Sequence, residues 1–167
     1  MQTLLLKADN PADVETAARI LRGGGLVGMP TETVYGLAAN ALDAQAVAKI
    51  FVAKGRPQDN PLIVHISQWE QIFPLVRRVP ESAKKLAGAY WPGPMTMVLE
   101  KSGRIPDVTS AGLPTVGIRF PSHPAARALI SAAGVPVAAP SANISGFPST
   151  ATAGHVMRDM AGKIDAV

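Results

Sequence analysis

A lysine and an arginine between residues 54 and 61 have the types and the spacing that suit an anion. Lys54 and Arg56 are separated by one glycine, and Pro57 follows them. The proline restricts the backbone, so two positive side chains stay close together, an arrangement suited to phosphate oxygens. The alternative is that both cations neutralise the last carbonyls of the preceding predicted helix. His65 comes near the end of the next apolar run, where a histidine is more often a core residue with one hydrogen bond than a ligand.

Hydroxyl and amide side chains are concentrated in two loops that each follow a predicted strand. Residues 30–37 contain two threonines, a glutamate and a tyrosine, and residues 139–146 contain Ser141, Asn143 and Ser145. Ligands of α/β folds bind at loops of this kind, and hydroxyl, amide and backbone N–H groups can together hold a nucleotide. Both loops are equally well explained as capped turns.

Arg119 lies inside a short apolar run, residues 116–120. A buried arginine needs an anionic partner. That partner is either a carboxylate of the protein or a carboxylate of a ligand, and the sequence leaves both open. Residues 91–94, Trp-Pro-Gly-Pro, predict a rigid turn with a structural role.

The elements that must position these residues alternate along the chain. Apolar residues at helical spacing, with caps such as Asn10, Asp43 and Gly134, predict helices, and short apolar runs predict strands. The predicted helices begin near residues 11, 44, 68, 81, 124 and 153, and the predicted strands are 26–29, 62–66, 96–100, 116–120 and 135–139. We therefore expect an α/β protein, a single domain with a twisted, mixed β-sheet flanked by helices.

Composition excludes several classes of protein. With 47% hydrophobic and only 17% charged residues, 15 glycines and 15 prolines, the chain is neither a disordered tail nor a coiled coil. It has no cysteine, so a disulfide framework and thiol chemistry are excluded. The three histidines are far apart, and no apolar run approaches the ~18 residues of a membrane span, so we expect no protein metal site, no membrane contact and a cytoplasmic location. The net charge of +4 suits a polyanionic partner such as a nucleotide or RNA, or an ordinary enzyme.

Together these segments resemble the YrdC-like family, the threonylcarbamoyl-AMP synthases. The motifs that carry the resemblance run in the family's order, from about Leu4 to Asp165. They are residues 30–37, Lys54 and Arg56 with Asn60-Pro61-Leu62, Trp91 to Thr96, Arg119-Phe120-Pro121, and Ser141 with Asn143. The Lys-Gly-Arg-Pro-x-x-Asn-Pro-Leu form is similar to the longer, two-domain branch of the family.

The resemblance implies an enzyme that joins L-threonine, bicarbonate and ATP into threonylcarbamoyl-adenylate and pyrophosphate. A separate transferase complex then modifies the adenosine beside the anticodon of certain tRNAs. By the same resemblance, L-threonine would be held by Thr33, His65, Arg119 and the backbone at Ala139. ATP would be held by Arg56, Asn60, Thr115, Ser141 and Ser149, and the catalytic residues beside its phosphates would be Lys54, Arg56, Ser141 and Asn143. Mg²⁺ is expected to arrive with ATP rather than in a protein cage.

The resemblance also implies that residues 1–167 are a YrdC-like catalytic domain truncated at its C-terminal end. In the family the domain continues past a stretch such as Lys163-Ile164-Asp165. Two other functions stay open. One is a double-stranded RNA or tRNA-binding module without catalysis, favoured by the charge and opposed by the low aromatic content of 5%. The other is a carbamoyl-transfer module, because related domains occur in hydrogenase-maturation proteins. That function would require zinc-finger and acylphosphatase-like partners, and this chain has no cysteine.

Overall fold

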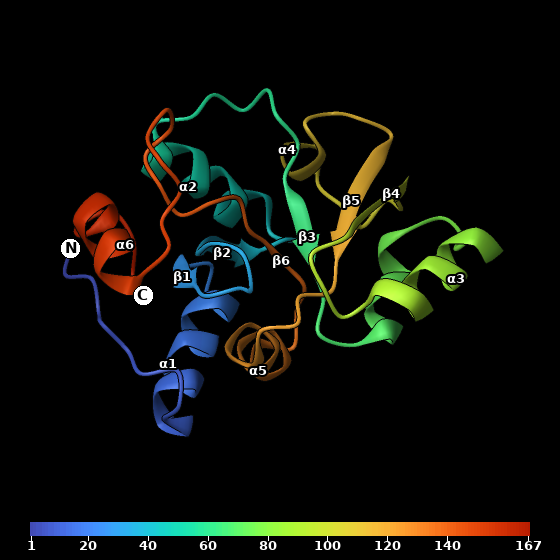
Figure 1. Ribbon diagram of the computed structural model, residues 1–167. Coiled ribbons are helices and arrows are strands. Elements are labelled where there is room, and N and C mark those ends of the chain that lie inside the picture. The colour runs from blue at the N-terminus through green and yellow to red at the C-terminus, as the bar shows by residue number, and fades with distance from the viewer.

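A mixed six-stranded sheet lies at the centre of this computed structural model, which describes all residues 1–167 (Figure 1). The strands are β1 (Val27–Met29), β2 (Gly36–Asn40), β3 (Ile63–His65), β4 (Thr96–Glu100), β5 (Thr115–Arg119) and β6 (Val137–Ala138). Their order across the sheet is β1-β2-β6-β3-β5-β4. Strands β3 and β5 are parallel, and every other neighbouring pair is antiparallel. The predicted single α/β domain with a mixed sheet is confirmed.

Helices cover the sheet in two layers. They are α1 (Pro11–Arg22), α2 (Ala44–Lys54), the 3₁₀ helix η1 (Trp69–Leu75), α3 (Glu81–Tyr90), α4 (Asp107–Ser110), α5 (Pro124–Ala133) and α6 (Ala153–Met160). The apolar faces of α1 and α5 form one core with Met29, Ala38 and Val137 of the sheet. The apolar faces of α2, α3, α6 and η1 form a larger core with the side chains of the opposite sheet face, such as Val64 and Ile118. None of the helices has the length and apolar character that a membrane span requires.

Helix ends follow the predicted capping residues. Asn10 accepts a hydrogen bond from the Ala12 amide at 2.9 Å and begins α1. Asp43 accepts from the amides of Gln45 and Ala46 and begins α2. Gly55 ends α2 with a φ of +62°, a left-handed conformation that glycine adopts at little cost. The sharp end of α2 fixes the position of Lys54, its last residue.

Three elements differ from the predictions. Strand β2 lies partly within the predicted loop 30–37, because its short alanine-rich sequence has low strand propensity and only pairing with β1 and β6 makes it a strand. The helix predicted near residue 68 is the 3₁₀ helix η1, which contains Pro74. Its start is capped by Gln71, whose Oε1 accepts from the amides of Ser67 and Gln68. Helix α4 has four residues and was not predicted.

One part of the sheet has no covering helix on one face. Alternation and register place Ile63 of β3, Val98 of β4 and Gly117 of β5 side by side on the same face as Val137. Helices α1 and α5 cover that face over β1, β2 and β6 but not here, and Ile63 and Val98 are 37% and 66% exposed. We call this region the open face. Its members are Ile63, Thr96, Val98, Thr115, Gly117 and Arg119.

Candidate functional site

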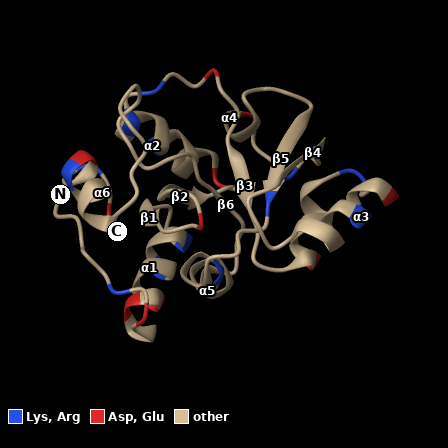
Figure 2. Ribbon diagram, in the orientation of Figure 1, with Lys and Arg blue, Asp and Glu red and all other residues tan.

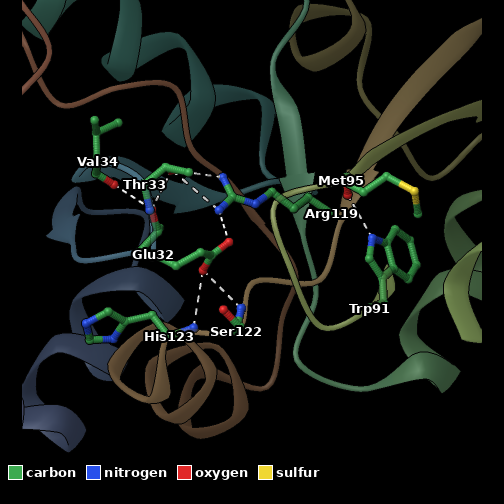
Figure 3. Close-up of polar contacts among 9 residues, drawn as sticks. Glu32, Thr33, Val34, Trp91, Met95, Arg119, Ser122 and His123 are labelled. Carbon is green, nitrogen blue, oxygen red and sulfur yellow. Dashed lines mark hydrogen bonds and ion pairs between the residues drawn. The ribbon is translucent and has the colours of Figure 1, made fainter. Parts of the chain in front are cut away.

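The carboxyl ends of β3 and β5 bring His65 and Arg119 together. The two residues are partners in the register of the parallel pair, and Arg119 also pairs with Thr96 across β4. The side chain of Arg119 reaches the loop between β1 and β2, where its Nη2 donates to Glu32 Oε1 (Figure 3). Both of its Nη atoms lie 3.5 Å from Thr33 Oγ1. The sequence left the partner of Arg119 open, and in the structure it is a carboxylate of the protein.

The Glu32 carboxylate is bound from two sides. Oε2 accepts from the backbone amides of Ser122 and His123, at 3.0 and 3.2 Å, where α5 begins. Burial alone would raise the pKa of Glu32, but the hydrogen bond and charge of Arg119, with the backbone amides, outweigh burial and lower the pKa to about 2. Glu32 is therefore ionised at any physiological pH.

The hydrogen bonds of the threonine hydroxyls in the same loop have a defined donor and acceptor. Thr31 Oγ1 donates to the Val34 carbonyl at 2.6 Å, which uses its one proton. The 3.0 Å contact between Thr31 Oγ1 and Thr33 Oγ1 must then be donated by Thr33. The lone pairs of Thr33 consequently face Arg119, so Thr33 offers a hydrogen-bond acceptor to this part of the site.

His65 lies beneath the site and is 2% exposed. Its Nδ1 is 3.1 Å from the Ile63 carbonyl. Burial, with the charge of Arg119, lowers the pKa of His65 to about 4. The imidazole is therefore neutral near pH 7 and adds no positive charge beside Arg119.

Lys54 is the centre of a second group of contacts. It is 2% exposed, and its Nζ donates to the carbonyls of Ser141 and Asn143, the latter at 2.9 Å. Burial, with the charge of Arg56, lowers the pKa of Lys54 to about 8. Asn143 donates to the carbonyls of Ile144 and Phe147, but its Oδ1 is buried without a partner. These contacts fix the 141–147 loop on the end of α2.

The turn at residues 91–94 supports the end of β5, in keeping with its predicted structural role. Trp91 Nε1 donates to the Met95 carbonyl at 2.7 Å (Figure 3), and the Gly93 amide donates to the Phe120 carbonyl at 2.7 Å. Phe120 directly follows Arg119, so the turn holds the backbone from which the arginine side chain extends.

Comparisons with known proteins identify the family. The model of the family Sua5_yciO_yrdC, described as "Telomere recombination", matches residues 19–167. The threonylcarbamoyl-AMP synthase of Pyrococcus abyssi is 54% identical over 154 residues, 92% of this chain and 45% of the relative. That of Bacillus subtilis is 50% identical over 159 residues, 95% of this chain and 46% of the relative. The chain belongs to this family. It spans less than half the length of these two curated relatives.

Solved structures of the family agree with this assignment. The crystal structure of P. abyssi Sua5 complexed with L-threonine has a TM-score of 0.95 and 50% identity to this chain, over 99% of this chain and 49% of Sua5. A full-length HypF structure, at 23% identity and a TM-score of 0.80, shares the fold. These solved structures therefore share the fold of this chain.

Three of the four residues predicted to hold L-threonine lie together in the structure. Thr33 and His65 lie at Arg119, and the Ala139 amide donates to the Ile63 carbonyl at 3.2 Å on the neighbouring strand. The set combines one cation, a neutral imidazole, a hydroxyl acceptor and backbone groups. Such a set can bind a small molecule that carries a carboxylate and hydrogen-bonding groups.

Three of the five residues predicted to hold ATP lie toward the opposite end of the strands. Thr115 begins β5 and is roughly 13 Å along the strand from Arg119, at about 3.3 Å per residue. Asn60 precedes β3 at the same end of the strands, and Ser141 forms a bridge with Gly36 at the start of β2. Arg56 lies over the Phe51 ring at 5.7 Å. Ser149 is exposed on the 141–150 loop, and the structure shows no side-chain contact that joins it to the others.

Two residues of the site received no role from the sequence. Thr31 and Glu32 lie in the loop that the sequence singled out, but nothing local shows which of its polar side chains contact Arg119. The feature of the sequence that pointed to them was Arg119 in its apolar run, for which a protein carboxylate was one of two candidate partners. In the structure, no group of three or more His, Asp or Glu side chains is placed to hold a metal ion.

Proposed function

We propose that this chain is the catalytic domain that forms threonylcarbamoyl-adenylate and pyrophosphate from L-threonine, bicarbonate and ATP. Relatives named threonylcarbamoyl-AMP synthase, at up to 54% identity, support it. The observation that carries the proposal is Arg119, a cation held between Thr33, His65 and Glu32 at one end of the open face. Asn60, Thr115 and Ser141, at the opposite end of the strands, would form part of the phosphate site.

At the Arg119 end, the guanidinium would bind the carboxylate of L-threonine. Thr33, with its lone pairs directed into the site, would accept a hydrogen bond from the substrate. His65 stays neutral at pH 7, and the backbone at Ala139 would complete the contacts. The amine of L-threonine would form a C–N bond to the carbon of bicarbonate with loss of water, which gives N-carboxythreonine there.

At the other end, Arg56, Asn60, Thr115, Ser141 and Ser149 would bind ATP. The carboxylate oxygen of N-carboxythreonine would attack the α-phosphorus, forming a P–O bond as the bond to pyrophosphate breaks. Lys54 would stabilise the charge on the phosphates, because two of its three N–H groups hold the Ser141 and Asn143 carbonyls and the third remains. Ser141 and Asn143 would position the phosphates, and Mg²⁺ would enter with ATP as part of the substrate.

The product would need a separate acceptor reaction. A threonylcarbamoyl-adenylate is a mixed anhydride that can transfer its acyl group to an amine. We propose that a separate transferase complex in the cytoplasm uses it to modify the adenosine beside the anticodon of tRNA. Direct contact of this chain with RNA is part of the same proposal.

The deciding experiment measures pyrophosphate release by the full-length protein with L-threonine, bicarbonate or ATP omitted in turn. We expect release to require all three, and release that is indifferent to L-threonine would refute the proposal. Duplex RNA binding that is strongly salt-dependent and indifferent to nucleotides would favour the RNA-binding module instead.

A binding experiment on this chain tests the Arg119 assignment. Calorimetric titration with L-threonine is compared for the wild type and Arg119→Gln, which we expect to weaken binding about 100-fold, because the charge-assisted hydrogen bonds are lost. The matched control is Arg22→Gln, which removes an exposed ion pair with Glu15. Equal affinity of Arg119→Gln and the wild type would contradict the assignment.

A further inference from the structure

Glu32 joins three parts of the molecule through one carboxylate. Oε1 accepts from Arg119 at the end of β5, and Oε2 accepts from the amides of Ser122 and His123 at the start of α5 (Figure 3). We infer that Glu32 is a positioning residue, which holds the Arg119 guanidinium in the orientation that receives the substrate carboxylate. The inference rests on the proposed function, because the substrate that it concerns is L-threonine.

The carboxylate itself is firmly placed. Two backbone amides at the N-terminus of α5 bind Oε2, and the partial positive charge of this ten-residue helix favours an anion there. The side chain is only 21% exposed. Glu32 is therefore a fixed point of the site and does not depend on Arg119 for its own position.

Arg119 depends on Glu32 in turn. The Arg119 side chain is long and 11% exposed, and its bound partners select its rotamer. Its Nη atoms contact Glu32 and, more distantly, Thr33 at 3.5 Å, whereas Nε is buried and has no partner. An unpaired buried N–H is costly. Glu32 is therefore the close side-chain partner that selects the orientation of the guanidinium.

A glutamine cannot replace this carboxylate. Glu32 uses both oxygens as acceptors, for donors on opposite sides. The side-chain amide that Glu32→Gln introduces would have an acceptor at one end and a donor at the other, so either Arg119 or the α5 amides would face an N–H group. The substitution therefore removes the orienting contact with almost no change in volume.

The experiment compares the wild type with Glu32→Gln by calorimetric titration with L-threonine and with ATP, and by thermal unfolding. We expect the dissociation constant for L-threonine to rise about tenfold or more, the effect of losing a charge-assisted hydrogen bond. We expect the dissociation constant for ATP to stay within twofold. The matched control is Glu15→Gln, which breaks an exposed ion pair with Arg22 and should change neither constant. Glu32→Asp, which keeps the charge but is too short to contact both partners, should weaken L-threonine binding in the same direction and serves if Glu32→Gln does not fold.

A spectroscopic readout separates positioning from a purely structural role. In ¹⁵N NMR the Arg119 Nε–H signal, assigned by its loss in Arg119→Lys, should exchange slowly in the wild type and be broadened by exchange in Glu32→Gln. An unchanged signal, unchanged L-threonine affinity, or an equal loss of ATP and L-threonine binding would overturn the inference. If the wild type itself binds no L-threonine, the proposed function fails, and the NMR comparison still decides whether Glu32 orients Arg119.

Discussion

At the scale of single residues, burial and close partners together hold the titratable groups of the site in defined charge states. Glu32 is kept ionised by Arg119 and the amides of α5, and His65 is kept neutral by its buried position. The pairing leaves the site with one oriented cation–anion pair and no second positive charge beside it. A carboxylate ligand would therefore be recognised by the geometry of Arg119 rather than by a large local charge.

The neutral state of His65 predicts a pH dependence of stability. The pKa falls from 6.5 to about 4 on folding, so between these values the unfolded chain binds more protons and the free energy of unfolding falls as the pH is lowered. We expect the wild type to lose about 3 kcal/mol more than His65→Gln between pH 7.5 and pH 4, at about 1.4 kcal/mol per pKa unit. Urea unfolding at both pH values measures it. An equal loss in both proteins would contradict the prediction, and other groups cancel in the comparison.

At the scale of elements, two glycines of similar surroundings have opposite roles. Gly88 lies inside helix α3, with ordinary helical φ, and a Cβ there would contact nothing within 4 Å. Gly134 ends α5, and a Cβ there would also contact nothing, but its φ is +70°. Both positions therefore have room for a Cβ atom, and only the backbone conformation distinguishes them.

This difference predicts opposite effects of one substitution. Gly88→Ala should raise the free energy of unfolding by about 0.5–1 kcal/mol, because alanine restricts the unfolded chain and favours the helix. Gly134→Ala should lower it by about 1–2 kcal/mol, because a left-handed conformation is strained for alanine. Denaturant unfolding of both variants provides the measurement, and effects of the same sign would show that the backbone argument is wrong.

At the scale of the whole molecule, the two ends of the chain lie together beside β1 (Figure 1). The amide of Leu4 donates to the Asp165 carbonyl and that of Val167 to the Leu4 carbonyl, each at 2.9 Å, and the Gly28 amide donates to the Ala166 carbonyl at 2.8 Å. Ile164 is fully buried in the larger core. Lys and Arg residues, in contrast, are spread over several elements of the chain (Figure 2).

The paired ends predict that the last residues of this chain are needed for stability. Deleting residues 163–167 should lower the free energy of unfolding by more than about 3 kcal/mol, since a buried isoleucine and several backbone hydrogen bonds are lost. Deleting residues 1 and 2 is the control, because both are exposed. Thermal and denaturant unfolding provide the comparison, and equal stability of the two truncated chains would contradict the prediction.

The sequence by itself determined most of the helices, the longer strands and the segments in which the site lies. Asn10, Asp43 and Gly134 cap helices through contacts within a few residues, and strand β4 matches its predicted range, residues 96–100. These features depend on local hydrogen bonds and on side-chain period, both of which neighbouring residues encode. The motif residues likewise mark the loops at strand ends before any contact is known.

Only the tertiary structure decided the partners. Glu32 and Arg119 are 87 residues apart, as are Lys54 and Ser141. Strand β2 exists because β1 and β6 pair with it, and η1 is a 3₁₀ helix where the sequence predicted a helix without showing its type. Strand order and register determine which side chains meet, and neither is contained in a local pattern of residues. For that reason the sequence could state that Arg119 needs an anion, and only the folded sheet shows that Glu32 supplies it.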